Sequence, residues 1–221
     1  RAPRRLDPAE ARRLLLAGRH LFVRTASLLA TMAIATSVAA RIGPATLAGH
    51  QIALQVHLFV ALALDGLAIP GQVLVGTLLG AGDRAETRAT SKRLLQLGVV
   101  GGVLVAVLIG ATAPVLPTLF TNDPAVVDRA RVALMVAALV QLPGAVAFVL
   151  DGVLIGASDF RYLQWSMVGG LAVFAPFALL VPANPSMGIA GVWAGLLAWM
   201  VARAAANVAR YRGSSWPAVP A

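Results

Sequence analysis

The sequence contains no cysteine and few charged residues. The lack of cysteine excludes a disulfide scaffold and any metal site built from thiolate ligands, and it leaves the redox compartment open. Charged residues occupy 12% of the 221 positions, whereas a soluble domain carries about 25%. Hydrophobic residues account for 59%, and the mean hydropathy is +0.82. This composition predicts a membrane protein.

Motifs of soluble enzymes are also missing from the sequence. It has no nucleotide-binding loop, no cluster of metal ligands, and no Ser/His/Asp arrangement beyond what chance supplies. GAGDRAETR (80–88) places glycines before charges, but it ends an apolar run instead of opening a helix after a strand. We therefore expect no enzymatic activity, no cofactor and no metal site.

The net charge of +9 raises the possibility of nucleic-acid binding. Such binding needs a basic face on a soluble domain. Here the arginines instead form short clusters between apolar runs, as in the loops of membrane proteins. We therefore expect no nucleic-acid partner. Arginine outnumbers lysine 17 to 1, which favours a bacterial source with a GC-rich genome.

Six apolar runs are long enough to cross roughly 30 Å of hydrocarbon as helices. They lie at about 20–41, 48–80, 94–116, 125–157, 161–181 and 187–208. Asp123 followed by Pro124 predicts the start of the fourth helix, because Asp caps a helix and Pro fits its first position. We expect an all-α membrane protein of six transmembrane helices. A basic cytoplasmic segment (1–19) precedes them and a cytoplasmic tail (209–221) follows.

Positive residues are divided unequally between the two sets of loops. The N-terminal segment, the loops after the second and fourth runs, and the C-terminal end carry fourteen, with Arg203 counted in the last group. The opposite loops carry three, namely Arg41, Arg129 and Arg131. Because the more positive side faces the cytoplasm, both termini are predicted to be cytoplasmic. The same count leaves Arg24 as the one positive residue that is assigned to neither set of loops and is placed in the membrane.

Three charged residues stand out inside the apolar runs: Arg24, Asp65 and Asp151. Such residues are costly in a membrane and usually face a cavity or a partner, so each is a candidate for function. Arg24 lies close enough to a helix end for its side chain to extend into the interface, which is the alternative to a functional role. For Asp65 the alternative is a protonated side chain that bonds a neighbouring helix.

The second run carries a polar stripe. On a helical wheel, Gln51, Gln55, Asp65 and Gln72 fall within an arc of about 100°. Pro70 removes a backbone hydrogen bond in the same run, so Pro70 and Gly71 form a predicted hinge, or alternatively a static kink.

Further polar residues extend the predicted cavity. Ser27 and Thr31 share a face with Arg24, and Gln141 precedes a possible bend at Pro143. The predicted cavity-lining residues are Arg24, Ser27, Thr31, Gln51, Gln55, Gln72 and Gln141. His50 and His57 are expected to point away from the Asp65 stripe, and Trp165, Trp193 and Trp199 to anchor helices at the membrane interface.

Three segments carry a resemblance to a known family. LAGHQIALQVHLFVALALDGLAIPGQVLVGTLLGAGD (47–83), LFVRT (21–25) and LDGVLIGASDFRYL (150–163) resemble the multidrug and toxic compound extrusion (MATE) family, and within it the bacterial DinF-like branch. This resemblance implies one of two six-helix lobes of a twelve-helix transporter, here the C-terminal lobe. The missing initiator Met and the basic start then fit an inter-lobe linker that follows an N-terminal lobe.

The resemblance also implies a function. Such proteins export cationic or amphipathic compounds by antiport of protons or sodium, with alternating access through rocking of the lobes. Asp65 matches the LDG pattern of the family, and Asp151 matches an acidic residue that binds the cation in the sodium-coupled branch. The second acidic residue of that branch has no counterpart here, because Arg24 lies nearby instead. We therefore expect Asp65 and Asp151 to couple export to protons more readily than to sodium.

The partners expected from the resemblance are a cationic or amphipathic small molecule, protons or sodium, membrane lipid and the N-terminal lobe. The expected location is a bacterial inner membrane. Two alternatives remain open. A flippase for lipid-linked precursors of the same superfamily needs a more cationic cavity, and Arg24 alone supplies little positive charge. An inactive truncated lobe would leave its polar stripe exposed to lipid.

Overall fold

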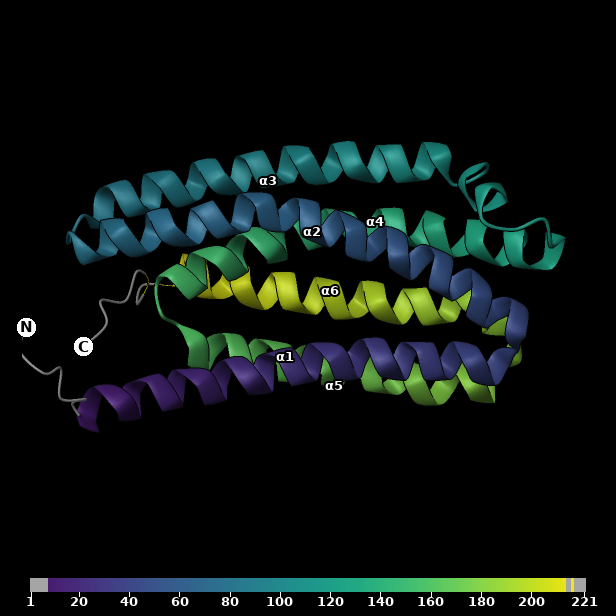
Figure 1. Cartoon of the computed structure of the whole chain (residues 1–221), viewed down its shortest axis with the longest axis horizontal. Helices are drawn as coiled ribbons and strands as arrows, with labels where there is room; N and C mark the ends of the chain where they lie inside the picture. The colour runs from purple at the N-terminus through teal and green to yellow at the C-terminus, as the bar shows by residue number, and fades with distance from the viewer. Residues whose placement is uncertain (1–7, 214–215, 217–221) are drawn as a thin grey trace, which may run out of the picture.

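In the computed structural model, which describes residues 8–213 and 216, six long helices account for most of the described chain (Figure 1). They are α1 (Pro8–Ile42), α2 (Pro44–Gly80), α3 (Arg84–Thr112), α4 (Pro124–Gly156), α5 (Phe160–Ala183) and α6 (Gly188–Arg212). Two short 3-10 helices, η1 (Leu116–Leu119) and η2 (Pro185–Met187), lie in loops. All six long helices have the length and composition to cross a membrane. The predicted fold class of six transmembrane helices is confirmed.

Several helices extend beyond the apolar runs. α1 begins at Pro8 and α3 at Arg84, so both include polar turns that the search for apolar segments left out. The start of α3 is stabilised by Asp83, whose side chain accepts a hydrogen bond from the Glu86 backbone N–H at 2.9 Å. Residues 1–7 of the predicted linker and most of the predicted tail lie outside the described residues.

The predicted start of the fourth helix is confirmed. Pro124 is the first residue of α4, and the Asp123 side chain accepts a hydrogen bond from the Ala125 backbone N–H at 2.9 Å. This cap satisfies one of the free N–H groups at the helix start.

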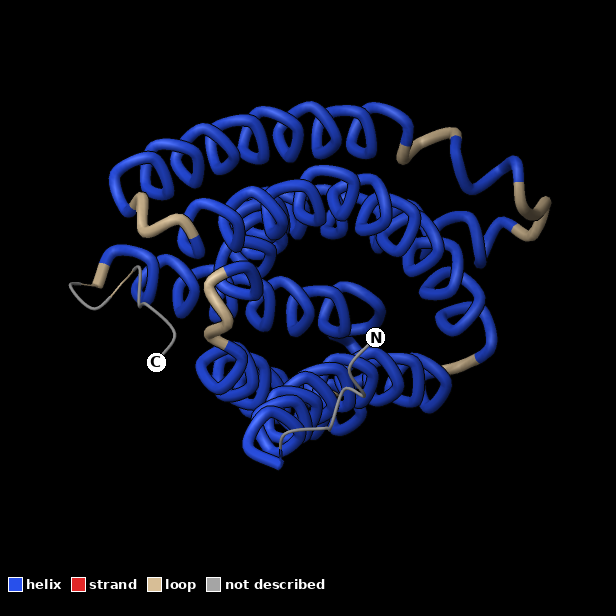
Figure 2. The backbone as a smooth tube through the Cα atoms, turned by 60° about the vertical axis from the view of Figure 1, so that its left-hand side comes forward, coloured by secondary structure: helices blue, strands red, loops and turns tan. Residues whose placement is uncertain are grey.

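The helices form a bundle in which α4 and α6 hold the centre. α4 packs against α2, α3 and α6, while α1 packs against α5 (Figures 1 and 2). The core includes Trp193 and Trp199, which are fully buried on α6. The expectation that these two side chains anchor the bundle at the interface was therefore wrong. Trp165 on α5 is exposed, as an interfacial side chain would be.

Glycines permit the close approach of α3 to α4. A Cβ atom added at Gly98 would lie 2.4 Å from Val149 Cγ2, and one added at Gly102 would lie 2.4 Å from Ala145 Cβ. By contrast, Gly101 has no atom within 4 Å of such a Cβ. Small residues at a helix contact let backbones approach, which is a main source of helix association within lipid.

We expect Gly102→Leu to destabilise the bundle, by roughly 1–3 kcal/mol if the helices shift apart to accept the side chain. The matched variant Gly101→Leu points into open space and should leave stability nearly unchanged. Thermal unfolding of both variants, followed by tryptophan fluorescence in detergent, tests this difference. Equal unfolding temperatures in the two variants would show that the α3–α4 contact is not tight.

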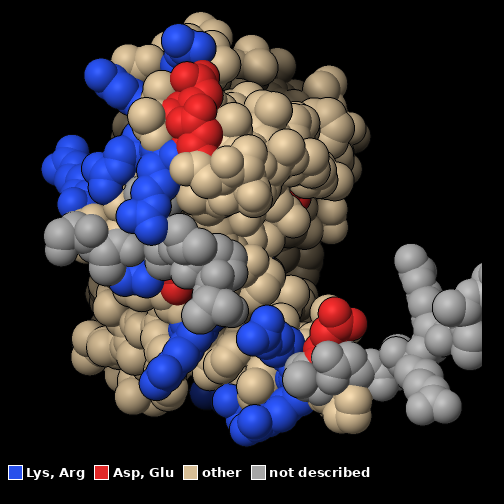
Figure 3. All heavy atoms as spheres, turned by 90° about the vertical axis from the view of Figure 1, so that its left-hand side faces the viewer, with Lys and Arg blue, Asp and Glu red and all other residues tan. Residues whose placement is uncertain are grey.

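Lysine and arginine gather at one end of the bundle, where α1, α3 and α5 begin and α2, α4 and α6 end (Figure 3). The described residues of this basic end are Arg12, Arg13, Arg19, Arg84, Arg88, Lys92, Arg93, Arg161, Arg210 and Arg212. Arg203 was wrongly counted among them, since its side chain is only 1% exposed inside the bundle. Without it the sequence count is thirteen against three, so the predicted orientation does not depend on Arg203.

Candidate functional site

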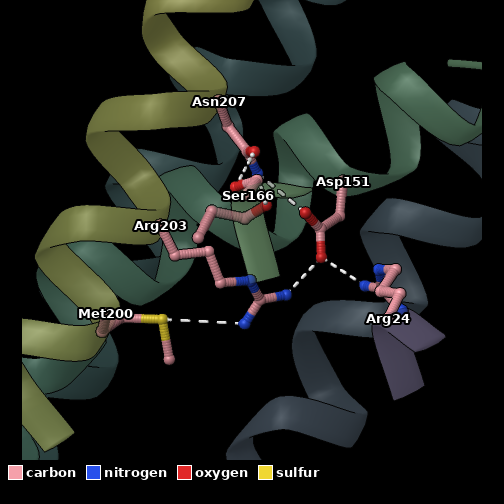
Figure 4. A network of polar contacts seen from close by, with 7 residues as sticks. Arg24, Asp151, Ser166, Met200, Arg203 and Asn207 are labelled. Atoms are coloured by element: carbon pink, nitrogen blue, oxygen red, sulfur yellow. Dashed lines mark hydrogen bonds and ion pairs between the residues drawn. The ribbon is translucent and has the colours of Figure 1, made fainter. Parts of the chain in front are cut away.

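Asp151 is the centre of a polar network that joins four helices (Figure 4). This carboxylate is buried on α4, and its Oδ2 accepts hydrogen bonds from Arg24 of α1 and Arg203 of α6. Its Oδ1 accepts a hydrogen bond from Asn207 Nδ2 of α6 at 2.7 Å. The Ser166 hydroxyl of α5 donates to Asn207 Oδ1 at 3.1 Å. One carboxylate therefore links α1, α4 and α6 directly, and α5 through Asn207.

The buried Arg203 is enclosed by aromatic rings. Its Cζ lies 5.1 Å from the centre of the Phe148 ring and 5.5 Å from that of Trp199. Both distances are within the range of a cation–π contact, which is strongest where water is excluded. Arg203 and Asn207 lie one helical turn apart on α6, so both reach the same carboxylate. This arrangement keeps a guanidinium charge inside the helix bundle.

A cavity of about 250 Å³ opens beside this network. α1, α2, α4 and α6 contribute its walls, which are made of Arg24, Leu28, Asp65, Ala68, Ile69, Gln72, Phe148, Asp151, Gly152, Ile155 and Arg203. α2 and α4 approach closely at its wall, because Gly152 lacks the Cβ that would lie 2.5 Å from the Ala68 carbonyl oxygen. The cavity brings together four predicted site residues: Arg24, Asp65, Gln72 and Asp151.

Asp65 differs from Asp151 in its surroundings. Its side chain is partly buried, lines the cavity, and makes no hydrogen bond or ion pair with another described residue. Asp151 accepts three such bonds. The cavity therefore contains one carboxylate, Asp65, that has no hydrogen-bond or ion-pair partner among the described residues, and one, Asp151, that already pairs with two arginines.

A second, more apolar cavity of about 390 Å³ adjoins the first. The two share Leu28, Asp65, Phe148 and Arg203. The second cavity continues between α1 and α2 along Met32, His57, Leu58, Ala61, Leu62 and Trp199. His57 thus lies on the same cavity as Asp65, contrary to the expectation that it points away. Together the cavities offer a charged end and an apolar extension.

The other predicted cavity residues lie elsewhere. The Ser27 and Thr31 hydroxyls bond to carbonyl oxygens one turn earlier on α1, at 2.8 and 2.9 Å. Gln55 is exposed and Gln51 half-buried, and neither lines the two cavities.

Gln141 belongs to a buried polar contact between α2 and α4. Its Nε2 donates to His57 Nδ1 at 3.1 Å and to the Ala137 carbonyl at 3.0 Å. The Trp193 ring lies between two histidines, 5.8 Å from His50 and 6.3 Å from His57, measured between ring centres. These side chains join α2, α4 and α6 in the half of the bundle away from the basic end.

The predicted hinges lie within continuous helices. α2 runs through Pro70 and Gly71, and α4 runs through Pro143. Pro70 is exposed, whereas Gly71 is buried, with a hypothetical Cβ 3.0 Å from Leu94 Cδ1. Movement at these positions stays a prediction.

Arg203, Asn207 and Phe148 were missed from the sequence. A signal was present for Arg203, because it lies inside the sixth apolar run (187–208), yet its nearness to the C-terminal arginines led to its assignment as a loop residue. Asn207 is spaced one turn from Arg203 on the same helix, which would have marked a shared face. Nothing in the sequence singles out Phe148 among its apolar neighbours.

Comparison with known proteins gives consistent matches. The MatE family model matches residues 21–180. Protein DETOXIFICATION 45, chloroplastic, of Arabidopsis thaliana is 37% identical over 206 residues, which cover 91% of this chain and 36% of that protein. The probable multidrug resistance protein NorM of Rhodopseudomonas palustris is 30% identical over 173 residues, covering 75% of this chain and 36% of that protein.

A solved structure of a MOP superfamily transporter from Pyrococcus furiosus has the same fold over most of the chain. The TM-score is 0.75 at 19% sequence identity, with 89% of this chain and 43% of that chain covered. This chain thus spans less than half of the solved transporter and little more than a third of the two curated relatives.

Proposed function

Because the chain belongs to the MatE family of multi-pass membrane transporters, we propose that it supplies the C-terminal lobe of a multidrug exporter. The exporter moves cationic or amphipathic compounds out of the cell in exchange for protons that enter. The observation that carries this proposal is Asp65, a carboxylate on a cavity wall inside a membrane-spanning segment, with no hydrogen-bond or ion-pair partner among the described residues. Charged groups at such positions mark ion and substrate pathways in transporters.

In this mechanism Asp65 carries either a proton or the positive group of the substrate. The two alternatives exclude each other, because one carboxylate cannot bear a proton and pair with a cation at the same time. The apolar cavity between α1 and α2 accommodates the rest of an amphipathic substrate. Exchange then requires the cavity to face each side in turn, by rocking of two lobes and bending of α2 at Pro70.

Protons are favoured over sodium as the coupling ion. A sodium site needs several oxygen ligands. On α4 the ligand would be Asp151, the residue that matches the cation-binding carboxylate of the sodium-coupled branch. Both oxygens of Asp151 already accept hydrogen bonds, from Arg24 and Arg203 on one side and from Asn207 on the other. Asp151 therefore holds the helices together in this proposal, while Asp65 exchanges the proton.

The proposal also covers the partner lobe, the family branch and the orientation in the membrane. An N-terminal lobe would cover the open side of the cavities, which fits the share of the relatives that the chain spans. The motifs LFVRT, LDG and GASDFR support the DinF-like branch. The basic end supports cytoplasmic termini. The proposed location, the plasma membrane of a bacterium, rests on the resemblance to the DinF-like branch.

The test is transport by the intact protein that contains this lobe. Reconstituted into vesicles with an acidic lumen, it should take up the cationic dye ethidium and alkalinise the lumen at the same time, and protein-free vesicles should do neither. A sodium gradient without a pH gradient should give no uptake. Uptake driven equally by sodium would refute the choice of ion, and no uptake under either gradient would refute multidrug export.

One observation favours a second candidate, a flippase for lipid-linked precursors. Arg203 adds a second buried cation beside Arg24, so the membrane core of this lobe is more cationic than the sequence count suggested. Translocation of a labelled lipid pyrophosphate, in vesicles that show no ethidium uptake, would support the flippase and replace drug export.

A further inference from the structure

The network around Asp151 contains more hydrogen-bond donors than acceptors. Each guanidinium group carries five N–H donors. Arg24 donates a hydrogen bond from Nη2 to Asp151 Oδ2. Arg203 donates from Nη2 to the same oxygen and from Nη1 to Met200 Sδ at 3.8 Å. The Nε atoms of both arginines are buried without a hydrogen-bond partner among the described residues. Two cations thus share one carboxylate and keep donors for a further acceptor.

The two arginines differ in access to the cavity. The Arg203 side chain is 1% exposed and lies against Phe148 and Trp199, whereas Arg24 is 17% exposed and lies on the far side of the carboxylate (Figure 4). If Arg24 turns to another anion, Asp151 keeps Arg203 and Asn207 as partners. Arg24 is therefore the arginine that can exchange its partner without leaving a buried carboxylate unpaired.

We propose that Arg24 is an anion-binding subsite for amphipathic compounds with a carboxylate or phosphate headgroup. The planar guanidinium matches both headgroups through paired N–H···O bonds. The apolar part of the compound lies in the adjoining cavity along Met32, Leu58 and Leu62. The inference rests on the proposed function in that these cavities bind the transported substrate.

Asp65 opposes the anion in this arrangement. It lines both cavities and experiences the charges of Arg24 on α1, Asp151 on α4 and Arg203 on α6. With both aspartates ionised, the four side chains are neutral in sum, and the loss of the Asp65 charge leaves one net positive charge. Neutralising Asp65 should therefore strengthen anion binding and weaken cation binding. The same substitution thus changes the two affinities in opposite directions, which identifies an anion-binding subsite.

The experiment measures binding of decyl phosphate and of decyltrimethylammonium to the intact transporter in an uncharged detergent, by isothermal titration calorimetry. Arg24→Gln should weaken decyl phosphate binding about tenfold or more, because it removes a charge-assisted contact, and should not weaken decyltrimethylammonium binding. Asp65→Asn should do the reverse. The control Arg19→Gln, on the exposed basic end of α1, should change neither.

A substitution that keeps the charge guards against misfolding as an explanation. Arg24→Lys retains a cation without the paired donors, so it should bind decyl phosphate with an affinity between those of wild type and Arg24→Gln. Equal decyl phosphate binding by wild type and Arg24→Gln, or an equal loss in Arg19→Gln, would overturn the subsite. Retained decyl phosphate binding in a protein that fails to transport ethidium would support the subsite while refuting drug export.

The headgroup can belong to a soluble compound or to a membrane lipid. Nanodiscs of phosphatidylglycerol and of phosphatidylcholine separate the two sources. If the lipid occupies the subsite, phosphatidylglycerol lowers the affinity for decyl phosphate by a larger factor in wild type than in Arg24→Gln, which has no cation at this position. If it does not, phosphatidylglycerol changes the affinity of both proteins by the same factor and the ligand is a soluble amphiphile. The two results support the same subsite and identify its occupant.

Discussion

Replacing Asp151 by Ala is expected to destabilise the lobe by about 3–5 kcal/mol, because a buried ion pair loses one partner and leaves the other charge uncompensated. Two guanidinium groups depend on this carboxylate, and Arg203 is almost fully buried. Asn207 would lose an acceptor as well. Equilibrium unfolding of the intact transporter by SDS in mixed micelles, followed by tryptophan fluorescence, measures the change.

A matched control is available on the same helix. Asp128 on α4 pairs with Arg131 at 3.4 Å, but its side chain is 73% exposed, so Asp128→Ala should cost less than about 1 kcal/mol. The double variant Asp151→Leu with Arg203→Met removes the carboxylate together with its more deeply buried cation and leaves only Arg24, whose side chain is 17% exposed, so it should recover part of the lost stability. If Asp151→Ala is as stable as Asp128→Ala, the network does not hold the helices together.

Replacing Asp65 by Asn is expected to reduce ethidium-driven proton flux by about tenfold or more, to near the level of protein-free vesicles, because the side chain keeps its size but loses the proton that is exchanged. Stability should change little, since Asp65 makes no hydrogen bond or ion pair with another described residue. The flux is measured with a pH-sensitive dye inside proteoliposomes.

Asp128→Asn serves as the control for this experiment, because it makes the same chemical change outside the cavities. It should transport like wild type. Full proton flux in Asp65→Asn would assign coupling to another residue, whereas equal losses in the two variants would indicate a general effect of charge on the vesicles.

The helices could be predicted from the sequence because their signal is local. An apolar run is long enough to span a membrane or it is not, and the Asp123–Pro124 cap lies beside the helix that it starts. Which helices meet is not local. Arg24 and Asp151 lie 127 positions apart, and Asp151 and Arg203 lie 52 apart, so the wheel of one helix cannot show their contact.

The polar stripe of α2 was predicted as one feature and proved to be two. Asp65 and Gln72 line the charged cavity, whereas Gln51 and Gln55 lie outside both cavities. α2 has 37 residues, and its two halves pack against different parts of α4. There Gly49 packs against the start of α4, with a hypothetical Cβ 2.8 Å from Ala130 N. A shared face on a long helix therefore does not ensure a shared cavity.

Arg203 shows a different limit of the sequence. The count of positive charges grouped Arg203 with Arg210 and Arg212 at the C-terminal end. In the sequence, Arg203 differs from these two residues only in lying further from the end of the sixth run. Its burial depends on a carboxylate from α4 and aromatic rings from α4 and α6. The stabilising partners come from the tertiary fold, so composition and periodicity could not reveal them.

The central claim is that Asp65, and not the arginine-bound Asp151, exchanges a proton for the substrate cation. Proton release on ethidium binding tests it most directly, with the intact transporter in weakly buffered detergent and a pH indicator. Wild type and Asp128→Asn should release protons as the dye binds, and Asp65→Asn should release none at any dye concentration. Proton release from Asp65→Asn equal to that of wild type would contradict the claim.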